Sequence, residues 1–237
     1  MIFDPLYLLV LGIGMALSLW ASARTKMAFA KYSKVNTRTG MTGKDVAERI
    51  LRDHGIHDVT VEAVPGKLTD HYDPRSRTLR LSEAVYGQRS MAALGIAAHE
   101  VGHAVQHAEG YGMLAFRSAW VPVANTGSGM SIFVIIAAVF LGGMATPLGS
   151  TLAIAGVLLF ATTTVFTLIT LPVEFDASKR ALLSLEAGRY MQSDELAGAK
   201  KVLDAAAMTY VAAFITSLLT LLYWAHRLGL LGGSRSN

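Results

Sequence analysis

The chain has no cysteine among its 237 residues. This absence excludes disulfide scaffolds, cysteine nucleophiles, iron–sulfur clusters and zinc sites built from thiolates. Charge is also scarce, because only 16% of the residues are Asp, Glu, Lys or Arg, while 52% are hydrophobic. Average proteins carry about 25% charged residues. We therefore expect a membrane protein in which any metal is held by histidine and carboxylate side chains.

Long stretches without a charged residue indicate where the chain crosses the membrane, since a bilayer core takes roughly 20 apolar helical residues. Residues 5–23 form one such stretch of 19, and residues 118–173 form another of 56. Glycines and a proline at 142–149 interrupt the longer stretch, as in a tight reversal of the chain. We predict four spans, at about 5–23, 121–142, 149–171 and 205–226.

The first span has an alternative interpretation, because Ala21-Ser22-Ala23 resembles the small-residue site of a cleaved signal peptide. The region before it contains Asp4 and no base, so we predict an uncleaved anchor instead.

Basic residues predict the orientation of the spans. Residues 23–119 carry 14 of the 21 Lys+Arg and residues 172–204 carry five. Because loops rich in Lys and Arg stay in the cytoplasm, we predict both segments there and the amino terminus outside. The bases are not interleaved with aromatic residues, so we expect no nucleic-acid partner.

Residues 23–119 contain the patterns of a small α+β domain. Thr42 and Asp45 form a capping box at the start of a helix predicted over 42–54. Alternating side chains predict strands at 58–64 and 77–81. Asp70-His71-Tyr72-Asp73-Pro74 between them is typical of a turn.

A helix predicted over 91–107 contains His-Glu-x-x-His at 99–103. Two histidines four residues apart lie on one helix face, so His99 and His103 can bind a single zinc ion. Glu100 then lies beside the metal, where a carboxylate can act as the general base toward water. Apolar residues surround the motif, and ionisable groups in such a helix usually have a partner.

Such a catalytic site needs a third protein ligand. His107 is excluded, because it lies about 12 Å from His99 along a straight helix. After Arg117 the first acidic residue is Glu174, and two membrane crossings return it to the side of the histidines. Pro172 fits the first turn of a new helix, which would place Glu174 near a helix start. We therefore predict His99, His103 and Glu174 as the metal ligands.

Three ordered motifs carry a resemblance to a known family: His-Glu-Val-Gly-His-Ala-Val-Gln-His at 99–107, the 70–74 segment, and Leu-Pro-Val-Glu-Phe-Asp-Ala-Ser at 171–178. Over about residues 2–225 the chain resembles the YugP-like bacterial membrane zinc metallopeptidases. More distantly it is similar to HtpX-type and CAAX-prenyl endopeptidases, which are gluzincins. The resemblance implies one Zn²⁺ per chain, held by two histidines and a glutamate, with the motif's Glu100 as base.

The resemblance also implies an organisation and a fold class, namely a mainly α membrane protein with about four transmembrane helices and a small α+β zincin-like (gluzincin) cytoplasmic domain. The predicted parts are a first transmembrane helix (1–23), the zincin-like domain (24–119), a transmembrane hairpin (120–171), cytoplasmic helices with the third ligand (172–204), a fourth transmembrane helix (205–228) and a tail (229–237).

One position departs from the HtpX-type pattern, which has an aspartate four residues after the ligand glutamate. Here that position is Ser178, and Asp176 lies about 200° around the helix from Glu174. We expect the group that orients a zinc histidine to be Ser178, or else Asp70 or Asp73. Asp176 does not simply inherit the role.

Three further residues are candidates for stabilising the transition state, namely His71, Tyr72 and Arg180. The predicted function is a membrane-anchored zinc endopeptidase, multi-pass in the bacterial cytoplasmic (inner) membrane, with its active site facing the cytoplasm. Its partners are the lipid bilayer and protein or peptide substrates, membrane proteins among them, and helix packing permits oligomers or partner subunits. The alternatives are a site-2-type intramembrane protease and a non-catalytic membrane scaffold that retains a zinc site.

Overall fold

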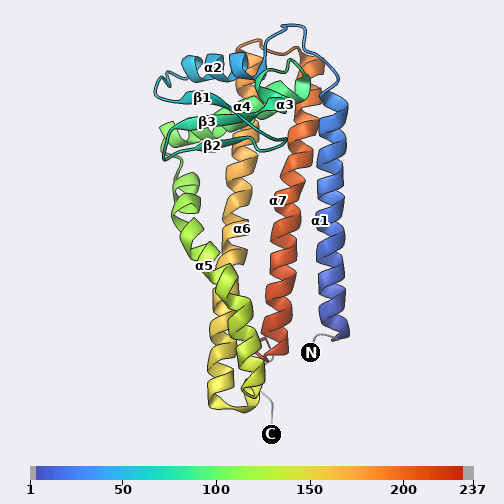
Figure 1. Ribbon diagram of the computed structural model, residues 1–237, viewed down its shortest axis with the longest axis vertical. Coiled ribbons are helices and arrows are strands. Elements are labelled where there is room, and N and C mark those ends of the chain that lie inside the picture. Colours follow the sequence, from blue (N-terminus) through green and yellow to red (C-terminus); the bar gives the residue numbers. More distant parts are fainter. Residues whose placement is uncertain (1–3, 232–237) are drawn as a thin grey trace. The chain divides into compact units, whose positions relative to one another are not determined.

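A computed structural model describes residues 4–231. Residues 232–237 of the tail predicted at 229–237 therefore lie outside the described residues. Most of the described chain is helical (Figure 1). The elements are, in chain order, α1 (Pro5–Tyr32), α2 (Gly43–Asp53), β1 (Thr60–Val64), β2 (His71–Asp73), β3 (Thr78–Ser82), α3 (Glu83–Tyr86), α4 (Met91–Ala108), α5 (Gly112–Phe140), the 3-10 helix η1 (Gly143–Ala145), α6 (Pro147–Ala187) and α7 (Ser193–Arg227).

The chain divides into two compact units. The helical unit comprises the chain up to Trp20, Phe116–Thr170 and the chain from Tyr210. The mixed unit comprises Ala21–Ala115 and Leu171–Thr209. Within the described residues, α1, α5, α6 and α7 are long and apolar enough to cross a membrane, which agrees with the four predicted spans.

In the helical unit, α5 and α6 form the predicted hairpin. The indole N–H of Trp120 donates to the carbonyl of Thr162 at 3.0 Å, and Gly156 packs directly against Ile135. Gly142 and Gly143 adopt φ angles of 93° and 57° in the connection, a left-handed conformation that favours glycine. Because α5 begins at Gly112, it starts before the predicted boundary at residue 121.

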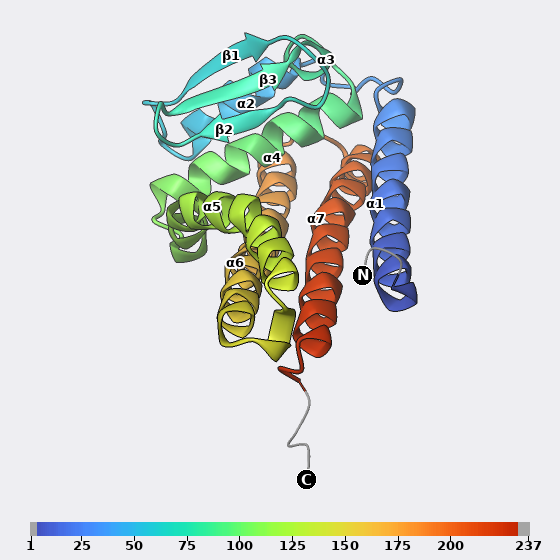
Figure 2. The same ribbon diagram turned by 60° about the horizontal axis from the view of Figure 1, so that its bottom comes forward.

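The mixed unit contains a three-stranded sheet in the order β1-β3-β2. Strand β1 pairs parallel to β3, and β2 pairs antiparallel to it. Leu79 and Leu81 alternate toward a fully buried core, while Arg80 between them faces the other side and pairs with Glu62. Helix α4 contacts β2 and β3 (Figure 2). The α4 face that meets the sheet therefore belongs to the core of this unit.

The helix predicted over 42–54 is confirmed as α2, with Thr42 and Asp45 forming a capping box. The turn predicted at 70–74 is wrong, because His71–Asp73 form strand β2. The carboxylate of Asp70 accepts hydrogen bonds from the backbone N–H and hydroxyl of Ser82. These bonds tie the beginning of β2 to the end of β3, which a turn-like composition does not reveal.

A second correction concerns Pro172, which lies inside α6 rather than at the start of a new helix. Proline in a helix interior removes one hydrogen bond and costs about 3 kcal/mol. The helix continues through the proline because the side of α6 opposite Pro172 carries a stripe of buried residues at four-residue spacing: Val173, Ala177, Ala181 and Leu185. Packing of this stripe offsets the local cost, so Glu174 lies deep within a continuous helix that begins at Pro147.

Candidate metal centre

Helices α4 and α6 bring together the three side chains predicted to bind a metal. Ser90 caps the start of α4, and His99 and His103 lie one turn apart on the helix. Glu174 projects toward them from α6, with its carboxylate 3.2 Å from His99 Nε2 and 3.7 Å from His103 Nε2. One potential ligand atom from each of the three residues lies within 4.8 Å of the other two.

The spacing of these atoms fits a zinc ion. Zinc binds histidine nitrogen and carboxylate oxygen at about 2.0–2.2 Å in a tetrahedral arrangement. Such a tetrahedron has edges of roughly 3.3–3.5 Å, which the two measured nitrogen–oxygen distances of 3.2 and 3.7 Å bracket. The donor set of two imidazoles and one carboxylate is also one that catalytic zinc uses, and it leaves a fourth position for water or substrate.

A glycine in the motif allows α4 and α6 to approach closely. A Cβ atom at Gly102 would lie 2.6 Å from the backbone carbonyl oxygen of Ala177, closer than any carbon side chain packs. Ala177 is itself completely buried. The backbone of α6 therefore passes directly against the motif, which holds Glu174 within reach of both histidines.

Gln106, which the sequence analysis did not select, orients His103. Its side-chain carbonyl lies 3.0 Å from His103 Nδ1, and its amide donates to the carbonyl of Val173 and the carboxylate of Asp176, each at 2.8 Å. Because both latter groups only accept, the amide orientation is fixed, and His103 must carry its proton on Nδ1. Its Nε2 is then the ring nitrogen directed at Glu174, which places it where a metal ligand would have to be.

Ser178 orients His99. Its hydroxyl lies 3.1 Å from His99 Nδ1, so Nε2 of this histidine also faces Glu174. Asp70 and Asp73 do not take this position, because Asp70 bonds Ser82 and Asp73 accepts from Ser76 and the backbone of Arg75. Burial raises the pKa of Asp70 despite its bonds to Ser82. Asp176 acts on His103 only through Gln106.

Glu100 lies beside the ligand cluster and outside it. The residue is 8% exposed, and its carboxylate makes no hydrogen bond to the described residues 4–231. Burial lowers the pKa of His103, but contact with Glu174 and the charge of Glu100 outweigh burial and raise it overall. The Glu100 carboxylate is thus free of structural bonds and close enough to His103 to influence its charge.

The structure does not bring the other predicted residues into the cluster. His71 is exposed on the sheet face of Arg80, and its Nδ1 contacts the carbonyl of Thr69 at 2.8 Å. Tyr72 faces α4 and bonds Nδ1 of His107 at 2.9 Å. Burial raises the pKa of Tyr72. Arg180 pairs with Asp176 and Glu109. A role for any of them in stabilising the transition state stays a prediction.

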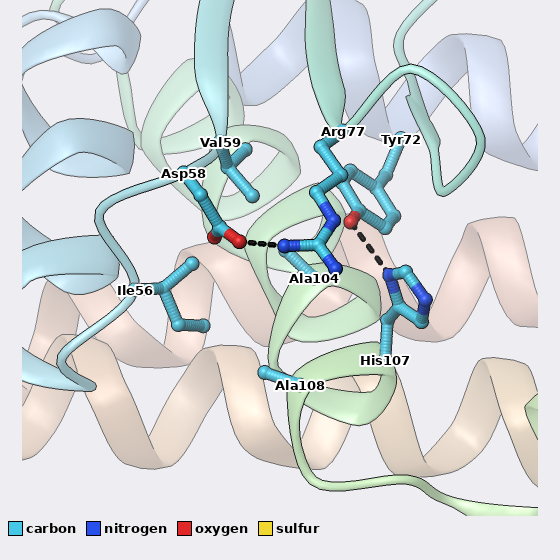
Figure 3. A pocket seen from close by; sticks show the side chains of 8 residues that line it. All are labelled: Ile56, Asp58, Val59, Tyr72, Arg77, Ala104, His107 and Ala108. Carbon is cyan, nitrogen blue, oxygen red and sulfur yellow. Dashed lines mark hydrogen bonds and ion pairs between the residues drawn. The ribbon is translucent and has the colours of Figure 1, made fainter.

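A cavity of about 270 Å³ opens next to the motif helix (Figure 3). Its α4 wall includes Ala104 and His107, and Tyr72 of β2 bonds the latter across it. Arg77, drawn next to Tyr72, pairs with Asp58, which lies on the side of the view away from His107. The cavity is thus lined by groups from α4, β2 and the segments that flank β1 and β3.

The comparisons with known proteins agree with this geometry. The family described as "Putative neutral zinc metallopeptidase" matches residues 7–228. The chain belongs to this family. Within it, the chain is similar to a protein of Bacillus subtilis (strain 168) named "Putative membrane protease YugP", with 48% identity over 92% of this chain and 93% of that one. The family resemblance drawn from the motifs is therefore confirmed. No solved structure matches the chain.

Replacing Gln106 by leucine should weaken zinc binding to this family member by about 10–100-fold, the usual cost of losing a partner that orients a ligand histidine. Leucine has a side chain of similar size but no polar atoms, so it leaves His103 Nδ1 without its acceptor. The measurement is competition for zinc against a fluorescent chelator, with thermal unfolding followed in parallel. Gln88→Leu, at an exposed position, is the control. Equal zinc affinities of the two variants would contradict the role of Gln106.

Proposed function

We propose that this protein is a membrane-anchored zinc endopeptidase of the gluzincin type, with one Zn²⁺ per chain and protein or peptide substrates. The observation that carries the proposal is the placement of His99, His103 and Glu174 within 4.8 Å of one another, with Glu100 beside them and free of hydrogen bonds within residues 4–231. Family membership supports zinc as the metal and peptide hydrolysis as the reaction.

His99, His103 and Glu174 would hold the ion. Bound zinc lowers the pKa of a coordinated water to about 7 and polarises a substrate carbonyl. Ser178 and Gln106 keep both Nε2 atoms directed at Glu174, so the ligands need no rearrangement. Glu100 takes a proton from the water that attacks the scissile carbonyl and delivers it to the leaving amine nitrogen. Its freedom from other partners suits a group that gains and loses a proton in every cycle.

The alternatives receive less support. Site-2-type proteases resemble one another in that an aspartate from a later span binds the metal. Here the carboxylate that lies next to the two histidines is that of Glu174. A scaffold with a vestigial site has no need for an intact base, whereas Glu100 stands beside a complete donor set. A protein that binds zinc and cleaves nothing would favour the scaffold.

The test of the proposal is metal removal from the full-length protein in detergent. We expect hydrolysis of an unfolded protein such as casein, or of quenched fluorescent peptides, to fall to background after chelation. Stoichiometric Zn²⁺ should restore it, because Glu100 acts on a water whose pKa the bound ion has lowered. The measurement is product formation with metal content determined by mass spectrometry. Hydrolysis that persists in protein shown to contain no metal would contradict the proposal.

We also propose that the active site faces the cytoplasm, because most Lys and Arg lie in 23–119 and 172–204, which include the ligands. The same hydrolysis assay, carried out in membrane vesicles, tests which side of the membrane the active site faces. A peptide that cannot cross the bilayer should be cleaved by inverted bacterial membrane vesicles and not by sealed right-side-out vesicles. The reverse pattern would place the site on the outer face.

A further inference from the structure

The cavity beside α4 has a defined position relative to the proposed base. Successive residues of an α-helix are rotated by about 100°, so Glu100, His107 and Ala104 lie about 60°, 40° and 100° around α4 from His103, all in the same direction. His107 is also one turn, about 6 Å, further along the helix than His103. The cavity thus continues the Glu100 face of the helix toward its carboxyl end (Figure 3).

A peptide positioned for hydrolysis must lie over that face. An extended chain advances about 3.3 Å per residue, so 6 Å corresponds to one or two residues from the scissile bond. Strand β2 forms the neighbouring edge of the sheet, and within residues 4–231 it pairs only with β3. Its free edge is a place where an extended peptide can add as a strand. The cavity is therefore within reach of a substrate group close to the bond that is cut.

The polar side chains of the cavity are Asp58, Tyr72, Arg77 and His107, and Arg77 is the one that only donates hydrogen bonds. Arg77 has five N–H groups and pairs with Asp58, which occupies only part of them. His107 uses Nδ1 to contact the hydroxyl of Tyr72. Asp58 is the single carboxylate among the lining residues. The Arg77 N–H groups that Asp58 leaves over can bind a further anionic group with acceptor oxygens.

The backbone of Arg77 is conformationally strained at the position that directs its guanidinium into the cavity. Its φ of 48° lies in the left-handed region, where a non-glycine side chain is strained. The backbone N–H of Thr60 donates to the carbonyl of Arg77 at 3.1 Å, which fixes this residue against the start of β1. Strained residues cluster at functional sites, where the side chain is needed in one position. Glycine would adopt this backbone conformation without strain, as it does at Gly55 and Gly110.

We propose that this cavity binds a carboxylate of the peptide substrate, one or two residues from the scissile bond, through Arg77. The proposal rests on the proposed peptidase function and adds a preference for acidic groups to it. The carboxylate comes from an Asp or Glu side chain or from the free carboxyl terminus of a short peptide. Both sources present the same two oxygens to the guanidinium.

Direct binding tests the proposal without relying on hydrolysis. The protein is the zinc-loaded, full-length Glu100→Gln variant in detergent, and the probes are fluorescein-labelled ten-residue peptides read by fluorescence anisotropy. In one set of peptides, Glu replaces Gln at successive positions. In a second set, the free acid replaces the carboxyl-terminal amide. We expect one of these exchanges to tighten binding by about tenfold or more, as for a charge-assisted hydrogen bond to arginine.

Two further variants in the same background identify the groups responsible. Arg77→Gly should abolish the preference for the acid, while the unfolding temperature stays the same or rises because the left-handed strain is relieved. Asp58→Asn should keep or strengthen the preference, because it removes the carboxylate that competes for Arg77. Equal affinities for acid and neutral peptides, no binding of any peptide, or an undiminished preference in Arg77→Gly would overturn the proposal.

The binding result and the proposed function can fail separately. If the wild-type protein cleaves nothing but the acid preference persists and depends on Arg77, the cavity is a peptide site and the peptidase proposal is wrong. If the wild-type protein cleaves peptides with the same positional profile as Arg77→Gly, the cavity has no part in substrate selection.

Discussion

Replacing Glu100 by glutamine should lower kcat/KM for peptide hydrolysis by about 10²–10⁴-fold, the usual contribution of a general base. That loss corresponds to about 3–5 kcal/mol of transition-state stabilisation. Glutamine has nearly the same shape but does not accept the proton of the attacking water. Because Glu100 lies outside the ligand cluster, zinc content should stay at one ion per chain. The measurements are peptide hydrolysis and metal content on the same preparation.

A matched control separates this effect from a general loss of charge. Glu83→Gln changes an exposed glutamate at the start of α3 and should leave kcat/KM unchanged. Full activity of Glu100→Gln with zinc bound would show that another group removes the proton. Zinc loss in that variant would instead show that Glu100 belongs to the ligand set.

Glu174→Ala should lower zinc affinity by more than about 100-fold and abolish hydrolysis. Partners that only orient a ligand are worth about 10–100-fold, so losing one of three protein ligands should cost more. Glu174 is 2% exposed, and its carboxylate faces both histidines. We therefore expect no exposed carboxylate to replace it as a ligand in the variant. Competition with a fluorescent chelator measures the affinity, and circular dichroism checks that the total helix content is unchanged.

Glu186→Ala is the control for this prediction, since Glu186 is an exposed carboxylate on the same helix. It should bind zinc as the unmodified protein does. If Glu174→Ala retained full zinc affinity, the third ligand would have to be another residue, and the geometry of the cluster would have no metal role.

The ligand cluster could be predicted because it depends on spacing and on topology, both of which are visible in the chain. Two histidines at a four-residue interval share a helix face wherever that helix lies. Glu174 followed from the 56-residue stretch without charge, since only an even number of crossings returns it to the histidines. Neither step requires knowledge of how side chains pack.

Gln106 could not be predicted with the same reasoning. Its role depends on the carbonyl of Val173 and the carboxylate of Asp176, 67 and 70 residues further along the chain. A weak signal was present, because Gln106 is a polar residue three positions after His103, on a helix whose remaining residues beside the motif are mostly apolar. Polar groups in such a position usually have a partner, but the sequence does not show which one.

The two errors in the fold have a common cause. Asp70–Pro74 has the composition of a turn, and Pro172 is typical of a helix start, yet packing determined both conformations. Pairing with β3 makes β2 a strand, and the buried stripe on α6 carries that helix through its proline. Local preferences of about 1–3 kcal/mol are overcome when a whole helix face or strand edge is buried.

Gly102 makes the His-Glu-x-x-His motif of this fold more specific than zinc chemistry alone requires. Zinc binding and base catalysis leave both residues between Glu100 and His103 open to any side chain. In this fold the second of them lies against the carbonyl oxygen of Ala177, where even a methyl group would meet it at 2.6 Å. A sequence search for proteins that build this site should therefore look for His-Glu-x-Gly-His. A chain with a larger residue at that place must move its two helices apart.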